Sequence, residues 1–141
     1  MNPSVYHNIV MDLNLWPVYD FLARRGSNLI KERGDGLETV ERAKLNAKID
    51  LLRMNGADLS PELLSDTNIP TIKKIRVKGR VAVRLMLCRG PIHVHDEFTL
   101  LMGAVEKDRK LIPSNAEGIA EERRLVVIAT QSRRTEHVRF R

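Results

Sequence analysis

The chain has 141 residues, of which 43% are hydrophobic and 30% are charged, and this composition predicts one folded domain spanning residues 1–141. No apolar run approaches the roughly 20 residues that a membrane helix needs, and the first residues lack the basic and apolar regions of a secretory signal. A single cysteine cannot staple the fold with a disulfide, so we expect a cytoplasmic protein.

Positive charge is concentrated in one part of the chain. The net charge is +6, and residues 71–90 contain seven basic residues and no acidic one. These bases are Lys73, Lys74, Arg76, Lys78, Arg80, Arg84 and Arg89. Such an excess favours an anionic partner, for which RNA is our first expectation. Residues 130–141 are also basic and are expected to form either a flexible arm on RNA or a polar tail.

The N-terminal part of the chain predicts one strand and one helix. Residues 4–11 alternate weakly between apolar and polar side chains, which indicates a short strand. Asn14 is placed to cap a helix over 15–32, and Pro17 falls in its first turn, where proline is tolerated. The glycines of residues 34–36 are expected to break the chain.

A second helix has the clearest pattern in the sequence. Asp35 and Glu38 have the spacing of a capping box, and Asn55-Gly56 predicts the helix end. Apolar residues three and four positions apart form a stripe that we expect to face the core. The stripe consists of Leu37, Val40, Ala47, Leu51 and Met54, and is widened by Leu45, Ile49 and Leu52.

Residues 57–70 contain two prolines and predict a loop, after which alternating apolar residues predict strands. The expected strands are residues 72–77, residues 81–88 and a strand or pair of strands within residues 92–105. The first two are separated at Gly79, and Arg84 lies in the middle of the face that points away from the core. The central strands therefore place positive charge on an accessible side of the sheet.

The C-terminal part predicts a short helix and an ambiguous final segment. Ser114 and Glu117 form another capping box, and the helix is expected to run to about residue 124. Residues 125–128 fit either the end of this helix or a final edge strand, and their β-branched content favours the strand. The order of elements predicts an α+β fold with an N-terminal strand and two helices packed on a mainly antiparallel twisted sheet, and a short C-terminal helix.

From about residue 43 onward, four stretches resemble the RelE/HigB superfamily of bacterial toxins, and most closely its phage-derived, HigB-like branch. The stretches are AKIDLLRMNGADLSPELL, IKKIRVKGRVAVRLMLCRG, DEFTLLMGAVEKDRKLIP and SNAEGIAEERR. Arg84 stands where the family has its strand arginine, and residues 106–110 stand where it has lysines before a proline. The resemblance implies a single RelE-like domain.

The resemblance also implies a function. It indicates the toxin of a type II toxin–antitoxin system, acting as a metal-independent mRNA endoribonuclease at the ribosome, with an antitoxin protein as its partner and no cofactor. The sequence departs from the family at Glu106, which replaces a lysine, and in its last tyrosine, which is Tyr19 and leaves His137 as the late candidate. Two alternatives therefore stay open: a non-catalytic RNA-binding relative and a gyrase-targeting toxin on the same fold.

Cleavage of RNA through its 2′-hydroxyl needs a base, cations near the phosphate and an acid for the leaving oxygen. The candidate catalytic residues are Arg84, Lys107, His95 and His137. The candidate nucleic-acid-binding residues are Lys73, Lys74, Arg76, Lys78, Arg80, Arg89, Arg109 and Lys110. Arg84 could instead pair with Glu97, and the lysines could instead protect an edge strand from aggregation. His93 and His95 lack a third ligand at a suggestive spacing, so no metal site is predicted.

Overall fold

The computed structural model describes residues 15–58 and 63–141. The expected strand over 4–11 lies outside these residues. Within them, the strands are β1 (Val18–Phe21), β2 (Ser65–Asp66), β3 (Lys73–Val77), β4 (Ala82–Arg89), β5 (Phe98–Lys107), β6 (Lys110–Ile112) and β7 (Arg134–Glu136). The α-helices are α2 (Leu29–Asp35), α3 (Thr39–Asn55) and α4 (Ala116–Ala129), and a 3-10 turn, η1 (Gly56–Asp58), follows α3. The predicted α+β class is confirmed.

The strands form one open, mainly antiparallel sheet in the order β2-β3-β4-β5-β1-β7. β5 is the longest strand, with ten residues, and its two halves pair with different neighbours. β1 runs parallel to the first half, with Val18 opposite Phe98, whereas β6 runs antiparallel to the second half, with Val105 opposite Ile112. β5 therefore connects the N-terminal, central and C-terminal parts of the sheet.

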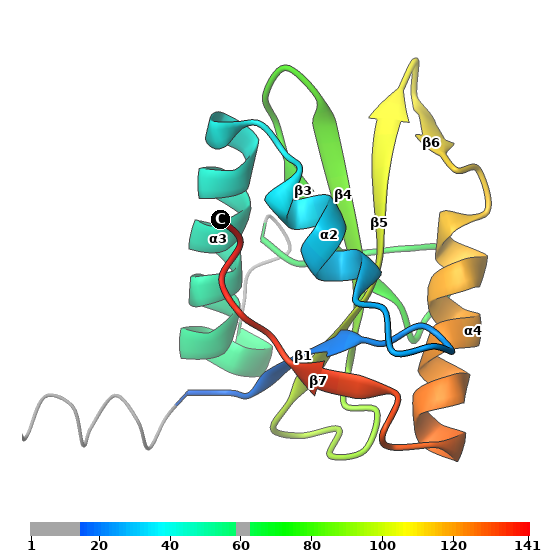
Figure 1. The fold of residues 1–141 in the computed structure, drawn as a ribbon. Helices are drawn as coiled ribbons and strands as arrows, with labels where there is room; N and C mark the ends of the chain where they lie inside the picture. The colour runs from blue at the N-terminus through cyan, green and yellow to red at the C-terminus, as the bar shows by residue number, and fades with distance from the viewer. Residues whose placement is uncertain (1–14, 59–62) are drawn as a thin grey trace, which may run out of the picture.

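Helices cover both faces of this sheet (Figure 1): α2 and α3 lie on one face and α4 lies on the other. Alternation along β4 sends Leu85 and Leu87 into the core under α2 and α3, and Met86 and Cys88 into a second core under α4. Burial raises the pKa of the Cys88 thiol to about 12, so this thiol is inert. The prediction that the second face would be accessible is therefore wrong for β4, whose Arg84, Met86 and Cys88 are buried, whereas Arg76 of β3 is exposed.

The predicted helix over 15–32 is wrong, since this region contains β1, a turn and α2. Val18 and Phe21 belong to the two different cores, on opposite faces of the sheet, which a strand permits and a surface helix does not. The chain then turns at Gly26, whose φ of +84° suits glycine. Asn28 caps α2 by accepting a hydrogen bond from the amide of Lys31.

The second predicted helix is confirmed as α3, which ends at Gly56 with a φ of +56°. Its capping residue is Glu38 and not Asp35, and its buried face is also different from the prediction. Leu45, Ile49 and Leu52 are buried, whereas Val40 and Met54 are each 56% exposed. The helix has two apolar stripes. The sheet packs against the stripe of Leu45, Ile49 and Leu52, which was expected only to widen the main stripe.

The C-terminal half also contains differences from the prediction. Residues 92–97 form a turn, so the strand begins at Phe98, and β6 was not predicted. Residues 125–128 continue α4, and the favoured edge strand there is wrong because Val127 packs as a helical residue in the second core. Tertiary packing thus overrides the β propensity of this segment. β7 forms instead at Arg134–Glu136, beside β1.

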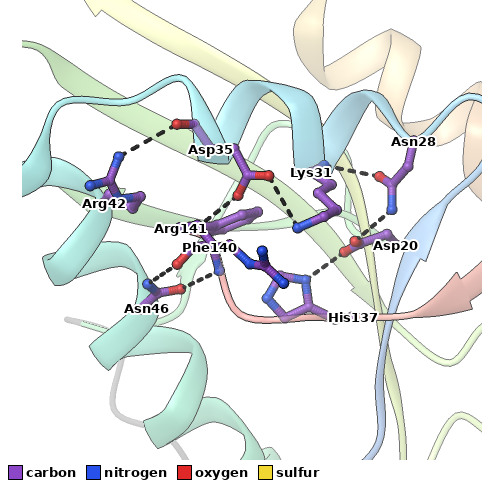
Figure 2. A network of polar contacts seen from close by, with 9 residues as sticks. All are labelled: Asp20, Asn28, Lys31, Asp35, Arg42, Asn46, His137, Phe140 and Arg141. Carbon is purple, nitrogen blue, oxygen red and sulfur yellow. Dashed lines mark hydrogen bonds and ion pairs between the residues drawn. The ribbon is translucent and has the colours of Figure 1, made fainter.

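The last residues of the chain are packed between α2 and α3 (Figure 2), and do not form a free arm. The side-chain amide of Asn46 donates to the carbonyl of Phe140 and accepts from its amide, each at 3.0 Å. The amide of Arg141 donates to Asp35 Oδ1 at 2.8 Å. This bond, followed by the contact with Lys31, lowers the pKa of the Asp35 carboxyl.

Candidate nucleic-acid interface

A hollow of about 410 Å³ at the edge of the sheet is lined by Lys44 and Lys48 of α3 together with Arg76 and Lys78 at the end of β3. The two helical lysines point the same way because they are four residues apart. Arg76 lies in β3, and Lys78 directly follows the last residue of this strand. Helix and strand thus bring four basic side chains together across about 30 positions of sequence. These four residues are called the cationic hollow below.

The two helical lysines of the cationic hollow, Lys44 and Lys48, are held in place by carbonyl oxygens. β2 pairs with Lys73 and Lys74, and within residues 15–58 and 63–141 no strand continues this pairing along the rest of β3. Lys44 Nζ donates to the carbonyl of Lys78 at 2.7 Å, and Lys48 Nζ donates to the carbonyl of Arg76. An ammonium group has three donors, so each lysine keeps donors for a bound anion. Because a carbonyl is neutral, these bonds do not neutralise the two ammonium groups, which form no ion pair with a described residue.

Like charges repel one another within the cationic hollow. Burial lowers the pKa of Lys48, and the neighbouring charges of Arg76 and Lys44 lower it further. The described residues that line the hollow include no carboxylate. The nearby Glu38 forms a distant ion pair with Arg80, at 3.6 Å. An anion in the hollow would relieve the repulsion, so the site is poised to bind one.

The connections β3–β4 and β5–β6 lie at the same end of the sheet (Figure 1), and further predicted residues lie in or next to them. Arg80 is in the first connection. The second connection is Asp108 and Arg109, flanked by Lys107 at the end of β5 and Lys110 at the start of β6, and all four are exposed. Arg109 has a φ of +66°, so it completes a tight turn in a conformation that side chains seldom adopt. One end of the sheet is therefore strongly basic.

The other predicted nucleic-acid-binding residues lie away from the hollow or are compensated. Lys73 Nζ lies 2.5 Å from Asp66 Oδ1, so its charge is paired. Lys74 is half-buried and has no ion pair among the described residues. Arg89 stacks over the ring of Trp16, at 5.8 Å, near the opposite end of β4. These positions do not extend the cationic hollow.

Arg84 is buried, with only 6% of its surface exposed. Its Nη2 lies 3.3 Å from Glu106 Oε2, and its Nη1 donates to the carbonyl of Val83. The alternative partner Glu97 is instead bound by Arg134, with Nη1 at 2.6 Å. Burial alone would raise the pKa of Glu97, but this pairing lowers it on balance. Arg84 is therefore an internal, paired residue, and the expected contact with a phosphate is not available to it.

His137 is buried against a carboxylate (Figure 2). Its Nδ1 lies 2.7 Å from Asp20 Oδ1, and the side chains of both residues are at most 4% exposed. Asn28 donates to the other carboxylate oxygen of Asp20, at 2.9 Å. His137 also lines a hollow of about 290 Å³ with Arg53, whose guanidinium has no ion pair in the described part of the chain and whose Nε is buried without a partner.

The four candidate catalytic residues are not brought into one site. Lys107 ends β5, and His95 precedes its start, so about ten strand residues, or roughly 30 Å, separate them. Arg84 is buried beside Glu106 of β5, whereas His137 lies against Asp20 and Phe140. These four residues were grouped as candidates because of the resemblance to the RelE/HigB superfamily.

Residues 15–58 and 63–141 contain no group of three His, Cys, Asp or Glu side chains arranged to hold a metal ion. His93 and His95 are exposed in the turn before β5. Among the described helices, none combines the length and apolar character required to cross a membrane.

Sequence reasoning missed half of the cationic hollow. Lys44 and Lys48 have the spacing that marks one side of a helix, but nothing local indicates that this side meets β3. It also missed Asp20 and Arg53, which surround His137. Comparisons with protein-family models, curated proteins and solved structures find no match for this chain.

Proposed function

We propose that this protein binds the sugar–phosphate backbone of RNA through the cationic hollow and the basic end of the sheet beside it. The observation that carries the proposal is the set of four clustered cations, of which Lys44 and Lys48 are anchored to carbonyl oxygens. Clustered cations on neutral supports bind phosphates because they release counterions without losing internal ion pairs. The choice of RNA over other polyanions rests on the resemblance to the RelE/HigB superfamily.

Binding to a labelled single-stranded RNA should weaken steeply as salt increases. Four contacted phosphates predict a slope of about −3 for the logarithm of the association constant against the logarithm of salt concentration. Arg76→Gln should flatten this slope by roughly one contact and weaken binding. Fluorescence anisotropy over a salt series measures both quantities.

Arg25→Gln is the matched control, because Arg25 is an exposed arginine in the turn between β1 and α2, outside the cationic hollow. Equal losses of affinity in the two variants, or a slope near zero, would contradict the proposal. Tighter binding to duplex DNA than to RNA would indicate that the cationic hollow binds DNA, and would favour the gyrase-targeting alternative.

A second candidate function is metal-independent RNA cleavage, as in a toxin with a protein antitoxin, and the pair of His137 and Asp20 favours it. A carboxylate on Nδ1 orients an imidazole so that its other nitrogen can exchange a proton. In this function Nε2 of His137 takes the proton of a ribose 2′-hydroxyl, whose oxygen bonds to phosphorus. The bond from phosphorus to the 5′-oxygen breaks, and that oxygen takes a proton from water. Arg53 would hold the phosphate.

Cleavage should leave 2′,3′-cyclic phosphate ends, and it should continue in the presence of EDTA. His137→Gln should slow it by about 10²–10⁴-fold, the usual contribution of a proton-transfer group. His95→Gln should have no effect, since His95 is exposed before β5. Intact RNA after prolonged incubation with tightly bound protein, with or without ribosomes, would favour the non-catalytic binding function.

A further inference from the structure

α3 presents an apolar stripe to solvent. The stripe consists of Val40, Ala43, Ala47, Leu51 and Met54, all exposed and spaced three or four residues apart. It extends over residues 40–54, or about 21 Å of helix. The packed stripe on the opposite side of α3 already fills the core, so this one is not required for the fold. A continuous apolar stripe of this length is typical of a surface that receives another helix.

The charges beside the stripe define its partner. Lys44 and Lys48, which belong to the cationic hollow, follow one edge of the stripe. The acidic residue on the other edge, Asp50, is already paired with Arg139. The uncompensated charge next to the stripe is therefore positive. The alanines at its centre let a second helix approach closely between the larger Val40 and Leu51.

We infer that this stripe is the docking site for an amphipathic helix of a partner protein, whose apolar face carries carboxylates along one edge. The carboxylates would contact Lys44 and Lys48, and the apolar face would cover Leu51 and Met54. A second copy of this chain fits less well, because an antiparallel pairing about Ala47 sets these lysines against the same lysines of the other copy. Since the cationic hollow uses the same two lysines, the partner and RNA compete, and this last clause rests on the proposed function.

Two synthetic helical peptides of about 18 residues, long enough to fold in water, test the inference. They share a Leu/Ala face, and the edges carry glutamates in one and lysines in the other. The glutamate peptide should bind the intact protein, and Leu51→Lys should weaken binding by about tenfold or more. Leu125→Lys is the matched control, since Leu125 is 51% exposed on α4. Isothermal titration calorimetry measures both, and circular dichroism checks that the variants are folded.

Each outcome decides one claim. Equal binding of both peptides, binding of neither, or equal losses in the two variants would overturn the docking site. Concentration-dependent dimers that Leu51→Lys dissociates would assign the stripe to a second copy and also overturn it. Displacement of labelled RNA by the glutamate peptide supports the competition. If the peptide binds but RNA does not, only the proposed function fails, and if RNA binds but the peptide does not, only the docking site fails.

Discussion

Arg84→Ala is expected to lower the free energy of unfolding by about 2–3 kcal/mol, because it removes one partner of an ion pair that is largely buried. The substitution leaves Glu106 without its guanidinium and the carbonyl of Val83 without its donor. Glu106 is half-buried and can regain some water, so the loss lies at the lower end for such pairs. Urea titration followed by circular dichroism measures it.

Arg76→Ala provides an internal comparison, because Arg76 lies directly opposite Arg84 in the register of β3 and β4. Its side chain is exposed and has no ion pair among the described residues. Its substitution should change stability by less than about 0.5 kcal/mol and weaken RNA binding. Arg84→Ala should do the reverse, with unchanged affinity per folded molecule. Loss of RNA binding by a stable Arg84→Ala protein would show that the buried arginine reaches the ligand after all.

These two arginines show what a sequence can predict of this site. Charge counting identified residues 71–90 as basic, and the structure places Arg76 and Lys78 of this stretch in the cationic hollow. Counting could not separate Arg76 from Arg84, since both lie on strands and both belong to the same basic stretch. The difference arises from packing between strands, since Arg84 is buried beside Glu106 of β5 whereas Arg76 lies on β3 and is exposed.

The predictability of the other elements also depends on whether neighbouring residues or distant contacts determine them. The C-terminal end of α3 was predictable because a glycine stop depends on neighbouring residues, whereas the expected cap at Asp35 is wrong. The buried face of α3 was not predictable, since two apolar stripes have the helical period and only contact with the sheet determines which stripe is buried. β1 was unpredictable for a related reason: a strand of four residues is stabilised by β5 and β7 on either side, and Pro17 next to it also fits a helix start.

The C-terminal segment packs very closely against one position in α2, which is Gly34. Phe140 is 5% exposed in the core between α2 and α3, and a Cβ on Gly34 would lie 2.1 Å from its Cδ1. Phe140→Ala should therefore lower the free energy of unfolding by about 3–5 kcal/mol, the usual cost of emptying such a site. Thermal and urea denaturation measure the loss.

Gly34→Ala should lower stability by about 1–3 kcal/mol through overpacking, although glycine to alanine in a helix normally raises it. In the double variant, the new methyl group enters the space that the ring has left. The combined loss should therefore be smaller than the sum of the single losses, by about 1–3 kcal/mol of coupling between contacting residues. Gly118→Ala in α4 is the matched control, since a Cβ at this position would meet nothing beyond its own helix backbone within 4 Å, and it should be neutral or stabilising. Additive losses would mean that the ring of Phe140 does not rest on Gly34, and the close packing of the C-terminal segment against α2 would have to be abandoned.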